Sequence, residues 1–147
     1  MPDIVRTGSA SWSGGLRNGK GTTSTGGGGL KDFNYSFHSR FENGPGTNPE
    51  ELIASAHASC FSMALSKILE DQGHPPESIR TTADLSMAKT ESGFKISKVH
   101  LRTEGRVSTI DEAAFKAAAE KAKENCPVSA LLKPGLENLS MEARLVR

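Results

Sequence analysis

The segment from Asn48 to Gly73 constrains the fold of this chain more than any other feature. Asn48 is a favoured helix N-cap, Pro49 suits the first helical position, and Glu51 can complete a capping box. Gly73 is the residue type that commonly follows the end of a helix. Together these signals predict one continuous helix of about 24 residues, which would be about 36 Å long.

No fixed charge interrupts this predicted helix between Leu52 and Ser66. Only His57 and Cys60 are ionisable in that stretch, so the helix lacks the charged face of a surface helix, and we expect it to be buried nearly all round. A chain of 147 residues has few elements with which to surround so long a helix. This predicts a homodimer with the helix at or near the interface. A monomer whose sheet wraps around the helix is the alternative.

The first third of the chain is expected to form short strands. Two strands are predicted around residues 4–12 and 19–24, in a region rich in glycine, serine and threonine. The alternation of Phe33, Tyr35 and Phe37 indicates a third strand with one buried face. This part of the chain is therefore predicted to be a β-sheet that precedes the long helix.

Further elements follow the long helix. Alternating apolar residues on both sides of Glu91–Gly93 predict a β-hairpin, and the apolar register slips between Ile96 and Val99, which predicts a bulge there. A capping box at Thr109 predicts a second helix that ends near Asn125. A short helix and a final strand complete the chain. This order predicts an α+β fold with largely antiparallel sheets.

Length and charge restrict the number of domains and the class of partner. The 147 residues suit a single domain over residues 1–147, and 18 basic against 17 acidic residues leave a net charge of +1. Such a balance provides no basic surface that would favour binding to nucleic acid or to an anionic membrane. No secretory signal is recognisable, and no run of ~18 consecutive apolar residues could span a membrane. We therefore expect a cytoplasmic protein with neither nucleic acid nor a membrane as partner.

The two cysteines are the first candidates for chemistry. In a reducing compartment Cys60 and Cys126 are both expected to be thiols, so a disulfide between them would be catalytic or sensory. With Pro127 at the first position of a helix, Cys126 would be its N-cap, where backbone N–H groups favour a thiolate. Cys60 lies beyond the first helical turns, so its reactivity would need a nearby cation or strong hydrogen-bond donors. As the alternative, both cysteines are packing residues.

No metal or cofactor site is predicted. The two cysteines match neither a zinc motif nor a CxxC pair, and the four histidines are scattered along the chain. His57, three residues before Cys60, is interpreted as a hydrogen-bonded interior histidine rather than as a general base. We therefore expect any chemistry to be carried by cysteine sulfur.

Three stretches carry a specific resemblance: Thr47–Leu52 (Thr-Asn-Pro-Glu-Glu-Leu), Ala56–Ser62 (Ala-His-Ala-Ser-Cys-Phe-Ser) and Cys126–Ser129 (Cys-Pro-Val-Ser). They resemble the osmotically inducible protein C family, OsmC, and the likeness extends over nearly the whole chain. It is closer to the OsmC branch than to the organic hydroperoxide resistance proteins. The resemblance implies an α+β domain whose largely antiparallel sheets wrap around a long buried helix, in an intertwined homodimer with active sites at the interface.

The resemblance also implies an activity, that of a thiol-dependent hydroperoxide reductase in oxidative and osmotic stress defence. Cys60 would attack the peroxide, and Cys126 would resolve the resulting sulfenic acid. Arg40, oriented by bidentate pairing with Glu50, would stabilise the thiolate, with Arg17 as the alternative to Arg40. The family needs no metal or haem. A dithiol, in particular a protein-bound dihydrolipoyl group, would reduce the disulfide.

The geometry of the predicted helix limits how Glu50 and Cys60 could serve the same site. Glu50 and Cys60 are ten positions apart on one predicted helix, which separates them by about 15 Å along its axis. A site that uses both would therefore need Glu50 from a second subunit. Apolar neighbours of Cys60 could line a pocket that prefers organic hydroperoxides to hydrogen peroxide, which would be a further substrate. As the alternative, which we favour for most of them, these side chains belong to the core. Two other functions are alternatives: a thiol redox sensor and a non-enzymatic protein that binds small apolar ligands.

Overall fold

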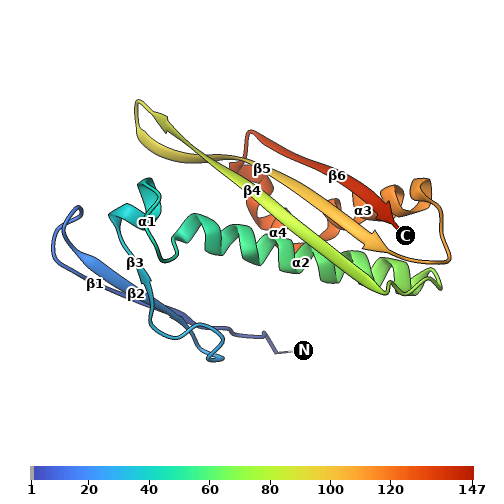
Figure 1. The fold of residues 1–147 in the computed structure, drawn as a ribbon, viewed down its shortest axis with the longest axis horizontal. Helices are drawn as coiled ribbons and strands as arrows, with labels where there is room; N and C mark the ends of the chain where they lie inside the picture. Colours follow the sequence, from blue (N-terminus) through green and yellow to red (C-terminus); the bar gives the residue numbers. More distant parts are fainter. Residues whose placement is uncertain (1) are drawn as a thin grey trace. The chain divides into compact units, whose positions relative to one another are not determined.

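The structure is a computed structural model that describes residues 2–147 (Figure 1). Its contacts fall into two compact units, the first ending at Leu52 and the second running from Ile53 to Arg147. The long helix α2, Pro49–Asp71, begins in the first unit and continues into the second. The single domain of residues 1–147 remains a prediction.

The first unit contains a small antiparallel sheet with the strand order β1-β2-β3, followed by a short helix. Its elements are β1 (Gly8–Ser13), β2 (Lys20–Thr25), β3 (Phe33–Tyr35) and α1 (Phe37–Phe41). β1 and β2 lie close to the predicted strands. The first unit is thus β-rich, as expected.

The third strand is shorter than the alternation of aromatic residues predicted. Phe37 does not extend the strand but begins α1, because Ser36 caps that helix: its hydroxyl accepts from the Ser39 N–H, and the Ser39 hydroxyl accepts from the Ser36 N–H. Phe33 is 48% exposed rather than buried. A local capping box therefore overrides the period-two pattern.

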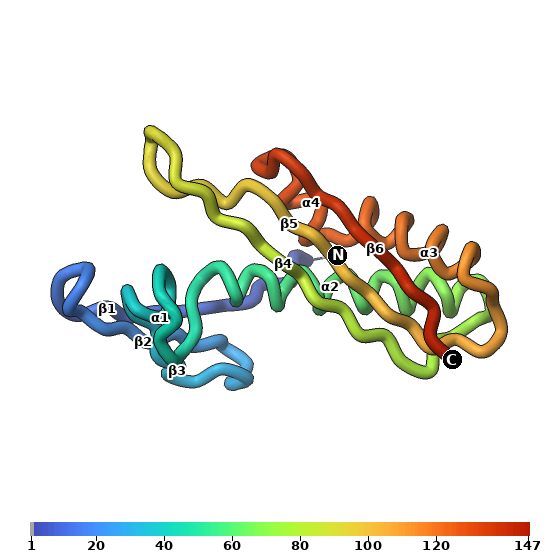
Figure 2. Tube along the Cα trace, turned by 45° about the horizontal axis from the view of Figure 1, so that its top comes forward, coloured from blue at the N-terminus to red at the C-terminus, as the bar shows by residue number. Residues whose placement is uncertain are grey.

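The second unit contains a three-stranded sheet with the order β4-β5-β6 (Figure 2). Its elements after α2 are β4 (Ser78–Thr90), β5 (Gly93–Arg106), α3 (Glu112–Asn125), α4 (Pro127–Leu132), the 3-10 turn η1 (Lys133–Gly135) and β6 (Asn138–Val146). β4 and β5 form the predicted hairpin. β6 pairs with β5 in parallel, because the chain returns through α3 and α4 before it re-enters the sheet.

The predicted bulge is present in β5. Ser86 pairs with Lys98 and Met87 pairs with Ile96, so Ser97 is the extra residue between them. This is the point at which the apolar register slips in the sequence. The side chain of Ser97 is buried, and its hydroxyl lies 3.5 Å from the Ser86 carbonyl oxygen as a weak donor.

Helix α2 begins and ends as predicted. The Glu51 N–H donates to the side-chain oxygen of Asn48 at 2.8 Å, which is the expected N-cap contact. Gly73 adopts a φ of 85°, the left-handed conformation that commonly ends a helix. The local signals on both sides of the helix were therefore sufficient to define it.

Burial along α2 differs from the expectation. From Ile53 onward, the buried side chains recur every four residues on one face, at His57, Phe61, Leu65 and Leu69. Met63, in contrast, is 77% exposed. By length and composition the helix could also cross a membrane, but its buried face belongs to the core of the second unit. The helix is thus covered on one face within a single chain.

The core of the second unit joins α2, β5 and α3 with Ala143 and Leu145 of β6. Its largest buried side chains come from α2, β5 and α3, among them Phe61, Leu65, Leu69, Leu101 and Phe115. The predicted apolar face of α3, which comprises Phe115, Ala118, Ala119 and Ala122, is buried in this core. Cys126 is fully buried at its edge, directly after α3.

The predicted start of α3 was wrong by two residues. Asp111 is the N-cap, and its side chain accepts from the Ala114 N–H at 2.8 Å. The Thr109 hydroxyl instead hydrogen-bonds to Nδ1 of His74 at 2.7 Å. Aspartate and threonine are both good N-cap residues, and a contact with a residue distant in sequence decides between them here.

Candidate active site

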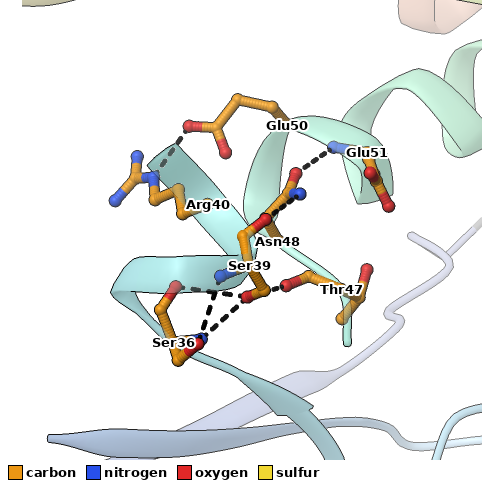
Figure 3. Close-up of polar contacts among 7 residues, drawn as sticks. All are labelled: Ser36, Ser39, Arg40, Thr47, Asn48, Glu50 and Glu51. Carbon is orange, nitrogen blue, oxygen red and sulfur yellow. Dashed lines mark hydrogen bonds and ion pairs between the residues drawn. The ribbon is translucent and has the colours of Figure 1, made fainter. Parts of the chain in front are cut away.

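Arg40 on α1 and Glu50 in the first turn of α2 form an ion pair within the first unit (Figure 3). Nε of Arg40 donates to Oε1 of Glu50 at 2.8 Å. The Glu50 side chain is 11% exposed, and its second oxygen is buried without a hydrogen-bond partner among the described residues. The contact is a single hydrogen bond, where bidentate pairing was expected from the sequence.

A set of hydrogen bonds holds α1 against the start of α2. The Ser39 hydroxyl donates to the Thr47 carbonyl oxygen at 2.6 Å, and the Asn48 side-chain amide donates to the Ser39 carbonyl oxygen at 2.8 Å (Figure 3). Asn48 is also the N-cap of α2. The same residue therefore starts one helix and ties down the other, which places Arg40 beside Glu50.

Arg17, the alternative to Arg40, makes a different contact. Its guanidinium carbon lies 4.7 Å from the centroid of the Phe37 ring, a distance typical of a cation–π interaction. Arg40 also lies over a ring, that of Phe41 at 5.2 Å, but in addition it is bound to Glu50. This geometry favours Arg40 as the arginine of the charged pair.

In the second unit, the fold brings Cys60 and Cys126 together. Both are free thiols, and they lie close enough together for Cys126 to raise the pKa of the Cys60 thiol. Cys126 lies at the junction of two helices, where its N–H donates to the Ala122 carbonyl oxygen and its carbonyl oxygen accepts from the Ala130 N–H. Two residues that are far apart in the sequence thus form one dithiol pair.

The surroundings of Cys60 favour its neutral form. Burial raises the pKa of the Cys60 thiol, and the adjacent Cys126 raises it further through the hydrogen bond and through charge. The backbone N–H of Val128 donates to the Cys60 sulfur and lowers the pKa, but the net shift is upward. Since the thiolate is the nucleophile, Cys60 needs an additional cation to react at neutral pH.

The sequence analysis did not predict that the Val128 N–H lowers the pKa of Cys60, although the sequence contains a signal for it. Pro127 occupies the first position of α4, so Val128 is the second residue of that helix. The N–H groups of a first helical turn have no acceptor within the helix. The sequence Cys126-Pro127-Val128 therefore offers a free backbone N–H, that of Val128, which in the fold serves Cys60.

His57 and Ser129 form a second contact between α2 and α4. Nε2 of His57 lies 2.7 Å from Oγ of Ser129, and both residues are buried. Burial lowers the pKa of His57, so the ring is neutral at physiological pH. The prediction of a hydrogen-bonded interior histidine is confirmed, whereas its partner, Ser129, was not foreseen.

The remaining parts of the structure offer weaker candidates. Among residues 2–147, no group of three or more histidine, cysteine, aspartate or glutamate side chains could hold a metal ion. A hollow on the β4-β5-β6 sheet is lined by arginine, glutamate and threonine side chains. Because Arg102 is bound to Asp84 and Arg144 to Glu104, these charges largely satisfy one another. The cysteine pair remains the strongest candidate for chemistry.

Comparisons with known proteins agree with the motifs. The family model described as OsmC-like protein matches residues 41–137. The chain is also 51% identical over 130 residues to peroxiredoxin OsmC of Escherichia coli (strain K12), a match that covers 88% of this chain and 91% of the relative. The chain belongs to the OsmC family. The resemblance predicted from its three motifs is thereby confirmed.

More distant relatives place this OsmC-family chain near the organic hydroperoxide resistance proteins. It is 29% identical to organic hydroperoxide resistance protein OhrB of Bacillus subtilis, over 77% of this chain and 82% of the relative. The solved structure of an organic hydroperoxide resistance protein OsmC from Legionella pneumophila has a TM-score of 0.67 at 28% identity, covering 95% of this chain and 99% of that one. The OsmC-like protein from Mycoplasma pneumoniae, at 14% identity and a TM-score of 0.76, shares the fold. The predicted α+β OsmC-like fold is confirmed.

Proposed function

We propose that this OsmC-family chain is a thiol-dependent hydroperoxide reductase that acts on organic hydroperoxides and on hydrogen peroxide. The proximity of Cys60 and Cys126 carries the proposal, because it places two free thiols within reach of each other. The relation to peroxiredoxin OsmC and to OhrB supports the reaction class. We assign the enzyme to antioxidant and osmotic stress defence in the cytoplasm, where such thiols stay reduced between turnovers.

The proposed reaction has two steps at sulfur. The Cys60 thiolate attacks the terminal peroxide oxygen, the O–O bond breaks, and the alkoxide leaves and takes a proton from solvent to form the alcohol, so that the peroxide is reduced and Cys60 becomes a sulfenic acid. Cys126 then attacks the Cys60 sulfur. The S–O bond breaks, the hydroxyl leaves as water with the proton of the Cys126 thiol, and a disulfide forms.

A dithiol completes the cycle by reducing this disulfide through thiol–disulfide exchange. We propose a dihydrolipoyl group bound to a protein as that reductant. Its two thiols can form a ring disulfide as the enzyme is reduced, so the exchange runs to completion. No metal or other cofactor takes part in this scheme.

Arg40 is proposed to supply the cation that Cys60 needs. A guanidinium stays charged even when it is partly buried, and it can donate to a thiolate and to a peroxide oxygen together. Glu50 orients it through the ion pair. Because Glu50 and Cys60 are ten positions apart on α2, about 15 Å along the axis, we propose that Arg40 and Glu50 of one subunit serve Cys60 of the other in a homodimer.

Peroxide consumption tests the proposal. Cumene hydroperoxide is mixed with the full chain and dihydrolipoamide, and peroxide loss is followed in wild type, Cys60→Ser and Cys126→Ser. We expect sustained turnover in wild type, no enzymatic loss in Cys60→Ser, and slower turnover in Cys126→Ser, whose sulfenic acid must be reduced without an internal partner. Equal, slow loss in all three proteins would contradict the proposal and favour a non-enzymatic binding protein.

A further inference from the structure

Helices α2 and α4 meet through two pairs of side chains with matching spacing. His57 precedes Cys60 by three residues on α2, and Ser129 on α4 follows Cys126, the N-cap of that helix, by three residues. Residues three apart on a helix lie on the same face, as His57 and Cys60 do on α2. His57 contacts Ser129, and Cys60 lies close enough to Cys126 for Cys126 to raise its pKa, so both pairs lie where α2 meets the start of α4.

The bond between His57 and Ser129 is buried on both sides. The two residues are 0% and 1% exposed, respectively, and their side chains approach to 2.7 Å. Nδ1 of His57 has no hydrogen-bond partner among the described residues. A buried N–H without an acceptor is rarer and costlier than a buried acceptor without a donor. We therefore assign the ring proton to Nε2, which donates to the Ser129 hydroxyl.

The start of α4 has little to hold it in place by itself. The helix spans Pro127–Leu132, six residues, and a helix this short depends on tertiary contacts for its stability. Cys126, at its N-cap, has a non-helical backbone and makes no side-chain capping bond. The positions of the Cys126 sulfur and of the Val128 N–H therefore depend on how the start of α4 is anchored, to α3 through the Cys126 N–H and to α2 through Ser129.

We propose that the hydrogen bond between His57 and Ser129 positions Cys126 for attack on oxidised Cys60. This inference rests on the proposed function, and specifically on Cys126 as the resolving thiol. In the resolving step the Cys126–Cys60 S–S bond forms while the S–O bond of the sulfenic acid breaks and water leaves. Loss of the anchor lets the start of α4 move away, which slows this step more than the attack of Cys60 on the peroxide.

The test separates the two steps in the full-length protein. Reduced protein is mixed rapidly with cumene hydroperoxide, and samples quenched over time are analysed by mass spectrometry for disulfide, for the dimedone adduct of the sulfenic acid and for sulfinic acid at Cys60. In Ser129→Ala we expect disulfide formation to be slower by roughly three- to tenfold, the effect of one lost hydrogen bond. Dimedone adduct and sulfinic acid should increase accordingly.

Three further variants make the result specific. Ser129→Thr keeps the hydroxyl and should restore the rate of disulfide formation. Ser62→Ala removes another side-chain bond of α2, the 2.8 Å contact with Thr81, and should resolve at the wild-type rate. The double variant His57→Leu/Ser129→Ala removes both polar groups, which spares the folding penalty of an unpaired one. It should resolve no faster than Ser129→Ala.

Several results would overturn the inference. One is disulfide formation in Ser129→Ala at the wild-type rate; another is an equal slowing of both steps, which would indicate a general loss of structure. Slow resolution in Ser62→Ala would show that the effect is not specific to the His57 contact. If wild type itself consumes peroxide without forming a disulfide, the resolving role of Cys126 fails, which is a separate outcome from failure of the anchor.

Discussion

Cys60 needs a nearby positive charge to become a good nucleophile. Burial and the neighbouring Cys126 raise its pKa, and the Val128 N–H compensates only in part. Arg40 is held by the largely buried Glu50, so its guanidinium is already oriented before substrate arrives. In the proposed dimer this preorganised cation would lower the pKa of the thiol and stabilise charge as the O–O bond breaks.

The pH dependence of thiol reactivity tests this role of Arg40. Arg40→Met removes the charge and keeps an unbranched side chain, so the raised pKa of Cys60 should then control its reactivity. We expect the alkylation rate of Cys60 by iodoacetamide to rise with pH around a higher midpoint than in wild type. Arg17→Met, the control, should keep the wild-type profile. Coincident profiles for Arg40→Met and wild type would exclude Arg40 as the cation of the site.

His57 makes the stability of the fold sensitive to mild acid. Its pKa is lowered by burial from the ordinary value of 6.5, so below that pH the unfolded chain binds a proton that the folded chain does not. The free energy of unfolding should therefore fall as pH drops from 6.5 towards the lowered pKa, and this group should have no effect above 6.5.

Urea denaturation at about pH 7.5 and about pH 5.5 measures this effect. His57→Gln cannot titrate, so its stability should decline less between the two conditions than that of wild type. The comparison uses the difference between conditions, so a constant loss of stability in the variant does not affect it. An identical decline in both proteins would show that His57 is not the group responsible.

At the level of elements, local signals predicted what local interactions decide. The limits of α2 follow from Asn48 and Gly73, and the bulge at Ser97 follows from a slip in the apolar pattern. The errors arise where two local signals compete, as at Ser36, which caps a helix in place of a continued strand. The contact of Ser129 with His57 joins residues that are distant in sequence, and no pattern in either segment reveals it.

The same distinction applies to the candidate site. Cys126 was placed as an N-cap because Pro127 follows it, and the pairing of Arg40 with Glu50 followed from the family resemblance. The single hydrogen bond of that pair, in place of two, depends on the hydrogen bonds that orient α1. Such details need the fold, because they are set by side-chain packing rather than by residue type.

A close approach between β5 and α3 gives a prediction about packing. A methyl group added at Gly105 would collide with the ring of Phe115, which is fully buried in the core. We expect Gly105→Ala to lower the free energy of unfolding by about 1–3 kcal/mol, measured by urea denaturation. Gly135→Ala adds the same group where no atom lies within 4 Å and should change stability little. Equal stability of the two variants would contradict the predicted collision.

At the scale of the whole molecule, α2 leaves apolar surface uncovered. No fixed charge lies between Leu52 and Ser66, only 22% of an apolar 18-residue stretch of the helix is buried, and Met63 is 77% exposed. An exposed apolar surface of this kind is typical of a protein–protein interface. A homodimer built on α2 would cover it and would also bring Arg40 of one subunit to Cys60 of the other.

Placing a charge on this surface tests the dimer. Met63→Arg should shift the protein from dimer to monomer in sedimentation, because burying an unpaired guanidinium in an apolar interface is costly. Peroxidase activity should fall with the dimer fraction. Glu70→Arg, on the same helix at an exposed and already charged position, serves as the control and should remain dimeric. A monomeric Met63→Arg protein with full activity would refute a site shared between subunits.

The mass of the protein after reaction with one equivalent of cumene hydroperoxide, without reductant, tests the two-cysteine mechanism most directly. Wild type should lose two hydrogen atoms, with Cys60 and Cys126 joined in the peptide map. Cys126→Ser should gain one oxygen atom at Cys60, and Cys60→Ser should keep its mass and leave the peroxide unreacted. Rapid peroxide loss in Cys60→Ser, or in wild type without oxidation at Cys60, would contradict the mechanism.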